Sequence, residues 1–263
     1  MLWLWNNLAY SGTWSTTNPS ASGYPVTNIG TLLAADVWRT GASVAAEQAT
    51  VILNQTVAYN SPLFPTFIVL KDHTLDTTVS GNVTFRLSNS GANAVTWTWT
   101  PTAGPSLIAV PAQVANSYNK LDISFTKNTA GTTAQIGKVF IGPSTETAPV
   151  GDFDWGNYSK TFTDATQINY SLTHQKFAVA RAQYETISLA IPLATETIEA
   201  LHRTIFKAVG TYFPFFLCPV NGATTTALSA PKYLTLASQP TEGLIGFGSD
   251  YLWGLSLDFE EQL

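Results

Sequence analysis

The three histidines are the first candidates for chemistry, because imidazole serves both as a catalytic base and as a metal ligand. They are His73, His174 and His202, and their wide separation does not match the spacing of a metal site. A serine–histidine–aspartate triad needs a nucleophile on a strained turn, and the sequence contains no Gly-x-Ser-x-Gly. His73 follows Asp72 at the end of an apolar run, where we favour a structural hydrogen bond. The sequence therefore predicts no catalytic or metal-binding histidine.

A pair of carboxylates is the next candidate, because glycoside hydrolysis uses two acidic residues. Asp152 and Asp154 flank Phe153 and precede Trp155, an arrangement that superficially suggests a sugar subsite beside an acid. Alternate residues of a strand point to one face, so both carboxylates would be either too close together or both in solvent. We favour a solvated strand start. The chain is thus predicted not to be an enzyme, with no catalytic residue, cofactor or metal; a polysaccharide depolymerase is the least favoured alternative.

Two pairs of tryptophans are candidates for contact with a ligand or a partner. Trp97 and Trp99 alternate with threonines and share one strand face with Val95. They could stack on sugar rings, although an apolar stripe that continues through them favours core or interface. Trp3 and Trp5 lie in the apolar N-terminal segment, which we expect to pack against a neighbouring subunit or the chain's own second half. The alternative is that this segment forms the first strand of the N-terminal half.

The composition limits the classes of partner. The chain has 263 residues, a net charge of −5 and only 11% charged residues. Its 12 basic residues are scattered, which argues against nucleic acid, because phosphate binding requires clustered lysine and arginine. A single cysteine, Cys218, excludes an internal disulfide. No apolar run suits a membrane-spanning helix and the N-terminus lacks the basic region of a signal peptide, so we expect synthesis in a cytoplasm without export by this route.

Alternation with a period of two dominates the first half and predicts strands with one buried face. Such strands are predicted at 83–88, 95–100 and 121–126, and residues 67–70 are apolar on both faces, as in a central strand. Many short strands without a convincing helix before residue 145 predict an antiparallel β-sandwich.

The second half has a different pattern. The composition of Pro143–Gly151 is that of a linker and predicts two domains, at residues 1–145 and 150–263. The second domain is predicted to be α+β, with a helix capped by Thr195 and ended by Gly210. The apolar stripe of this helix consists of Ile198, Leu201, Ile205 and Ala208/Val209.

Three motifs of the first half occur in a familiar order. They are Val37-Trp38-Arg39-Thr40, the segment 66–75 (TFIVLKDHTL) and the segment 136–142 (IGKVFIG). In this order they resemble the galactose-binding-like jelly roll of the discoidin type, and more narrowly the version found in tail proteins of bacterial viruses. A weaker resemblance to the C-terminal part of the same tail proteins covers Phe153-Asp154-Trp155-Gly156 and the segments that follow.

The resemblance implies a non-enzymatic structural component of a bacteriophage virion, in the tail tip or baseplate. It would be made in the host cytoplasm and would act in assembly and in attachment to the host surface. The implied partners are other tail subunits, further copies of the chain in a homo-oligomer, and a host surface polysaccharide, with no nucleic acid and no membrane span. The alternative is a carbohydrate-binding module of a secreted or surface protein; a capsid decoration protein is a less favoured one.

Overall fold

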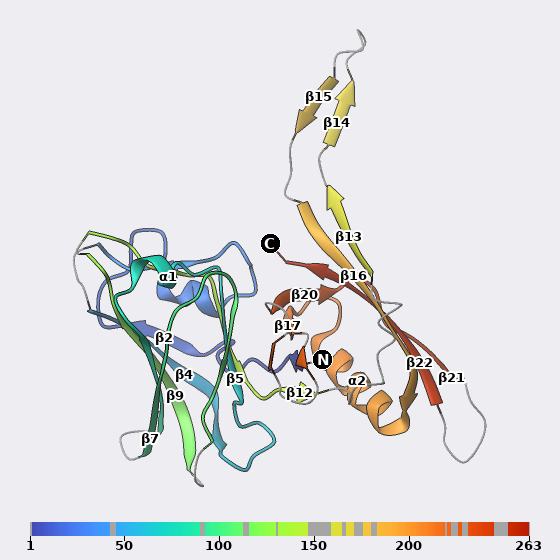
Figure 1. Cartoon of the computed structure of the whole chain (residues 1–263), viewed down its shortest axis with the longest axis horizontal. Coiled ribbons are helices and arrows are strands. Elements are labelled where there is room, and N and C mark those ends of the chain that lie inside the picture. Colours follow the sequence, from blue (N-terminus) through green and yellow to red (C-terminus); the bar gives the residue numbers. More distant parts are fainter. Residues whose placement is uncertain are drawn as a thin grey trace.

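The computed structural model of the chain shows a mainly β molecule (Figure 1). The predicted fold class is confirmed: an antiparallel β-sandwich is followed by an α+β part with one main helix. The structure describes residues 2–42, 46–89, 93–112, 116–129, 131–146, 159–164, 167–170, 176–179, 183–218, 220–221, 226–227, 231–244 and 252–262.

Two antiparallel sheets face each other in the sandwich. The five-stranded sheet has the order β2 (Thr13–Thr16), β4 (Ala46–Ala58), β9 (Ser117–Thr126), β6 (Val83–Asn89) and β7 (Asn93–Trp99). The three-stranded sheet has the order β11 (Lys138–Gly142), β5 (Phe67–Lys71) and β8 (Ser106–Ala109), and a separate pair joins β3 (Trp38–Arg39) to β10 (Gln135–Ile136). Apolar side chains fill the sandwich core, and its largest fully buried members include Trp38, Phe85 and Tyr118.

The strands predicted from alternation are confirmed. In β6, Val83, Phe85 and Leu87 are fully buried, whereas Arg86 between them is exposed. Two short helices, η1 (Val26–Gly30) and α1 (Leu75–Thr78), correct the expectation of no helix before residue 145. Each is only four or five residues long, which is too short to display a helical period in the sequence.

A second, larger sheet belongs mostly to the second half of the chain. Its order is β12 (Thr145–Glu146), β1 (Leu2–Leu4), β17 (Phe215–Cys218), β20 (Lys232–Leu236), β22 (Leu252–Glu261), β16 (Gln183–Thr195) and β13 (Ser159–Asp164), and β21 (Thr241–Leu244) also pairs with β22. Helix α2 (Glu196–Val209) packs on one face of this sheet, around the side chain of Trp3. Two short hairpins complete the described elements, β14 (Gln167–Tyr170) with β15 (Lys176–Val179) and β18 (Val220–Asn221) with β19 (Thr226–Ala227).

The predicted helix is confirmed with its boundaries. It begins at Glu196, directly after Thr195, and ends at Val209. Gly210 has a φ of 54°, a left-handed conformation that glycine adopts without steric cost, and its N–H donates to the Phe206 carbonyl at 2.8 Å.

The N-terminal strand β1 belongs to the second sheet, although the sandwich strands follow it directly in the sequence. Leu2, Trp3 and Leu4 pair in antiparallel register with Cys218, Leu217 and Phe216 of β17. The prediction that this segment packs against the chain's own second half is confirmed, and the alternative of a first sandwich strand is wrong. The domain boundary near residue 145 stays a prediction, although β1, at the start of the 1–145 range, lies in the second sheet.

The three-stranded sheet of the sandwich packs against the second sheet. The buried contact consists of Leu2, Leu4, Val69, Phe140, Phe216, Cys218 and Tyr233. This contact explains why residues 67–70 are apolar on both faces: Ile68 and Leu70 point into the sandwich core, whereas Val69 faces the second sheet. Figure 1 shows β1, β12, β17 and β20 on the side of the second half that is nearest the sandwich.

One part of the second half extends far from the rest. Strand β13 pairs along its length with the first six residues of β16, and the β14–β15 hairpin lies between these two strands in the sequence. Figure 1 shows this hairpin projecting away from both the sandwich and helix α2.

Candidate functional site

A cavity lies where the sandwich meets the second half, and we call it the junction cavity. It encloses about 200 Å³. Its walls come from the segment that follows β1, from η1 and the loop after it, from β11, and from the stretch that joins α2 to β17. Its lining includes Trp5, Asn6, Asn7, Tyr10, Thr31, Leu32, Asn54, Lys138, Phe213 and Tyr233.

Aromatic side chains form much of the wall. Tyr10 and Phe213 meet edge to face, with ring centroids 5.4 Å apart and planes at 88°. The chain turn at Gly210 and the bond from the Phe213 N–H to the Val209 carbonyl, at 3.1 Å, fix Phe213 at this position. Trp5, which is half-buried, also lines the cavity. These faces provide a surface on which a flat apolar group can stack.

Tyr233 and Asn7 stabilise the cavity wall through hydrogen bonds within the protein. The Tyr233 hydroxyl donates to the Leu32 carbonyl at 3.3 Å, and burial raises the pKa of this phenol, which keeps it protonated as a donor. The Asn7 side chain donates to the Val139 carbonyl at 3.0 Å and accepts from the backbone N–H groups of Ala9 and Ile141, each at 3.1 Å. These bonds hold the N-terminal segment against β11.

Lys138 is the charged group at the cavity. Its Nζ donates to the Asn28 carbonyl, the Thr31 hydroxyl and the Asp36 carbonyl, each at 2.9 Å. Burial lowers the pKa of Lys138 to about 8, while the nearby Asp36 acts in the opposite direction. All three ammonium donors are therefore used within the protein, and Lys138 braces the loop after η1. Its bonding favours a neutral ligand in the cavity over an anionic one.

The sequence-predicted tryptophans lie in three different surroundings. Trp3 is fully buried and stacks on Phe215, with centroids 5.6 Å apart, so it belongs to the core around α2. Trp5 lines the junction cavity. Trp97 and Trp99 lie half-buried on the inner face of β7, where Trp97 stacks on Phe85 at 5.5 Å. A ligand-binding or partner-binding role for the four tryptophans stays a prediction.

The structural reading of His73 is confirmed. Its Nε2 lies 3.3 Å from the Ser106 hydroxyl, and its ring meets Trp99 edge to face at 5.6 Å. Burial lowers the pKa of His73, which favours the neutral imidazole. His202 is fully buried against Trp3.

Several other predictions concern residues outside the described ones, namely Asp152, Asp154, the Phe153–Gly156 motif, His174 and the part of the linker after Glu146. Among the residues that are described, no group of three or more histidine, cysteine, aspartate and glutamate side chains could hold a metal ion. In the same part of the chain, no helix combines the length and apolar character needed to cross a membrane.

Sequence reasoning missed the junction cavity. Tyr10 and Phe213 are more than two hundred positions apart, and Lys138 lies in a strand whose other residues are apolar. The local signal was that Tyr10 falls outside any strand alternation, so the sequence pattern did not assign this aromatic side chain to a core.

No protein-family model matches the sequence, and a search of curated proteins finds no match. Solved structures resemble about half of the chain. A mutant of chitosan-binding module 1 from a Paenibacillus sp. IK-5 chitosanase/glucanase has a TM-score of 0.42 and 15% identity, covering 52% of this chain and 97% of its own. The Clostridium perfringens module CpGH89CBM32-4 has a TM-score of 0.39 and 18% identity, and the match covers 52% of this chain and 98% of the module. A Ruminococcus gnavus GH29 fucosidase has a TM-score of 0.43 and 11% identity, and the match covers 54% of this chain and 27% of the fucosidase. This is a partial likeness of fold, which decides neither ligand nor activity.

Proposed function

We propose that the chain is a non-enzymatic binding protein and that the junction cavity holds a neutral saccharide ring. The observation that carries the proposal is a cavity with aromatic walls whose lining also includes Asn6, Thr31 and Asn54, at the boundary of two packed sheets. A sugar ring has apolar C–H faces, which suit aromatic side chains, and a hydroxyl edge, which suits amide and hydroxyl groups.

The same residues favour binding over hydrolysis. Among the residues that the structure describes, neither aspartate nor glutamate lines the cavity. Glycoside hydrolysis uses a pair of carboxylates that flank the scissile bond. A saccharide held here would therefore be recognised and released unchanged, which supports the binding proposal over a depolymerase.

The first prediction tests this cavity. We expect isothermal titration of the full chain to detect binding of galactose or N-acetylglucosamine. Tyr10→Ala and Phe213→Ala should each weaken that binding by at least about fivefold, because an aromatic contact is worth ~1 kcal/mol beyond its buried area. Phe162→Ala is the matched control, since Phe162 is 72% exposed and does not line the cavity. Absence of binding to neutral mono- and oligosaccharides, or equal loss in the control, would contradict the proposal.

A second candidate function is that of a bacteriophage tail subunit, and the projecting hairpin favours it. The β14–β15 pair lies outside the body of the molecule, and an isolated two-stranded hairpin is at best marginally stable in water. The sequence of the hairpin includes Ile168, Tyr170, Phe177 and Val179, so a partner could bury apolar groups on it. On this proposal the hairpin joins the chain to tail subunits or further copies of itself, within a virion assembled in the host cytoplasm.

The second prediction tests this assembly role. Asp164 and Gln183 are paired across β13 and β16, so replacing residues 165–182 by a two-residue Asn-Gly turn should close the strands without disturbing the sheet. We expect an unchanged melting temperature together with loss of incorporation into purified virus particles, measured by mass spectrometry. Particles that contain the shortened chain in normal amount, or that lack the intact chain, would rule out this role.

A further inference from the structure

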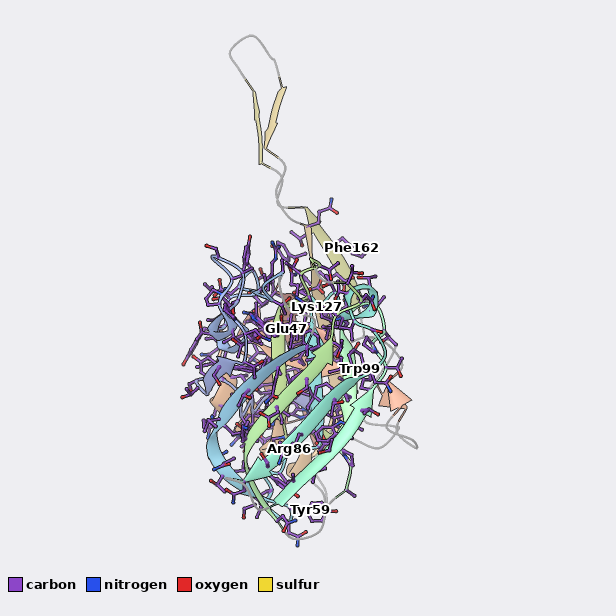
Figure 2. The ribbon with its side chains drawn as sticks, turned by 90° about the vertical axis from the view of Figure 1, so that its left-hand side faces the viewer. Glu47, Tyr59, Arg86, Trp99, Lys127 and Phe162 are labelled. Carbon is purple, nitrogen blue, oxygen red and sulfur yellow. The ribbon has the colours of Figure 1, made fainter. Side chains whose placement is uncertain are left out.

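The outer face of the five-stranded sheet carries two rows of polar side chains, and we call it the polar face. One row runs from Gln48 through Ser124 and Thr84 to Thr98, and the other from Thr50 through Asp122 and Arg86 to Thr96. Each row crosses the same four strands, β4, β9, β6 and β7. At about 4.8 Å between strands, a row is ~14 Å long. Figure 2 views this sheet from outside, with Arg86 on the face toward the viewer.

Asp122, in the second row, is a buried carboxylate whose charge is balanced by a neighbouring lysine. A single oxygen, Oδ1, accepts from the Thr50 hydroxyl at 2.6 Å and from the Gln48 amide at 3.1 Å. The same oxygen pairs with Lys120 Nζ at 3.1 Å, and the Asp122 side chain is only 4% exposed. The carboxylate therefore fixes its three neighbours in place, and its charge is balanced by Lys120.

Arg86 differs from its neighbours because its charge is not balanced. It is exposed and its backbone pairs in register with Asp122 and Thr96, yet in the part of the chain that the structure describes its guanidinium forms no hydrogen bond or ion pair. A guanidinium offers five donors in a planar fork that matches a carboxylate. In a chain with a net charge of −5, this free cation sits at the centre of a hydroxyl-rich surface.

The surface is also hollowed beside the first row. A shallow cavity there is lined by Thr17, Gln48, Asn82, Thr84, Ser124 and Thr126, among other residues. Residues with hydroxyl and amide groups thus line most of this depression, and Glu47, whose charge is paired with Lys127, also contributes to its lining. Such groups can hydrogen-bond to sugar hydroxyls, and the Arg86 guanidinium, which has no ion-pair partner among the described residues, supplies a site for an anion.

We propose that the polar face binds an acidic polysaccharide, one whose sugar rings carry carboxylate groups. The polymer lies across the strands, with a carboxylate on Arg86 and its hydroxyls along the two rows. This site is separate from the junction cavity, where Lys138 uses all its donors within the protein, and it does not depend on the function proposed for that cavity.

The test compares polygalacturonate with dextran, an uncharged polymer, in affinity electrophoresis of the full chain at low ionic strength. We expect polygalacturonate alone to retard the protein. Arg86→Gln should weaken retention by at least about tenfold, because hydrogen bonds between charged partners are the strong ones. Arg86→Lys should recover only part of it, since an ammonium cannot make the two-pronged contact. The melting temperature should not change, because Arg86 is exposed.

Lys207→Gln is the matched control, because it removes one positive charge from an exposed position on α2. Equal weakening by Lys207→Gln and Arg86→Gln would overturn the proposal and indicate attraction by overall charge. Equal retention by dextran, or no retention by polygalacturonate, would also overturn it. Tyr10→Ala should leave retention unchanged, so failure of the junction cavity as a saccharide site is distinguishable from failure of the polar face.

Discussion

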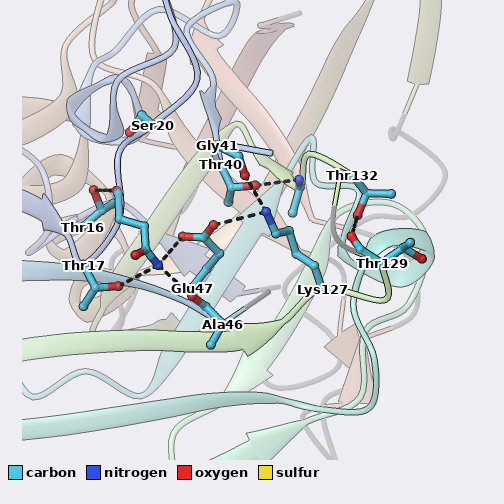
Figure 3. A network of polar contacts seen from close by, with 12 residues as sticks. Thr16, Thr17, Ser20, Thr40, Gly41, Ala46, Glu47, Lys127, Thr129 and Thr132 are labelled. Carbon is cyan, nitrogen blue, oxygen red and sulfur yellow. Dashed lines mark hydrogen bonds and ion pairs between the residues drawn. The ribbon is translucent and has the colours of Figure 1, made fainter. Parts of the chain in front are cut away.

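At the scale of single residues, the least expected feature is an ion pair buried at one end of the sandwich. Glu47 Oε1 lies 3.3 Å from Lys127 Nζ, and the two side chains are 1% and 0% exposed. Figure 3 shows Lys127 between Glu47 and the Gly41 carbonyl, to which it also donates. Asn18 donates to Glu47 Oε2 at 3.3 Å. The network ties the loops at Asn18 and Gly41 to strands β4 and β9.

This arrangement predicts an asymmetry between single and double substitutions. Lys127→Met should lower the free energy of unfolding by about 3–5 kcal/mol, because it leaves a buried carboxylate without its partner. The double variant Glu47→Gln, Lys127→Met should recover much of that loss, since neither remaining group is charged. Chemical denaturation of the three proteins measures both effects.

The control is Lys160→Met, which breaks the ion pair between Lys160 Nζ and Glu185 Oε2. These two atoms are 3.8 Å apart, and the lysine side chain is 39% exposed. Solvent screens such a pair, so its loss should change the free energy of unfolding by no more than about 1 kcal/mol. If Lys127→Met were as mild as this control, the buried pair would not hold the end of the sandwich together.

At the scale of elements, strand β1 is the part on which the joining of the two halves depends. It alternates between two cores: Trp3 points toward α2, and Leu2 and Leu4 point toward the three-stranded sheet. Three residues thus contribute to the packing on both faces of one sheet. Its partner strand β17 holds Cys218, which pairs with Leu2 and is fully buried.

This placement predicts that removing residues 1–5 exposes the thiol. Burial raises the pKa of Cys218 to about 11, so the intact chain should react slowly with a thiol-specific reagent at neutral pH. The truncated chain should react many times faster. It should also lose several kcal/mol of stability, because removing a buried aromatic such as Trp3 costs ~3–5 kcal/mol. Equal reaction rates for the intact and truncated chains would show that β1 does not cover β17 in solution.

At the scale of the whole molecule, the sandwich and the second half share a buried apolar contact. Val69 and Phe140 of the sandwich meet Phe216 and Tyr233 of the second sheet, and the Tyr233 hydroxyl bonds back to Leu32. The junction cavity lies beside this contact, so its two walls are held at a fixed separation by the packing. The polar face and the projecting hairpin lie on other surfaces, which leaves them accessible when the halves are packed.

The sequence by itself determined the elements whose signals are local. The alternation of Val83, Phe85 and Leu87 predicted β6, and Thr195 and Gly210 predicted the ends of α2, because these patterns depend only on neighbouring residues. The tertiary structure alone decided which surfaces meet. An apolar stripe in Leu2–Leu4 shows that the segment is buried but not which sheet buries it. Likewise, Tyr10 and Phe213 became one cavity wall only when segments distant in the chain packed together, and a period in the sequence carries no information about such a contact.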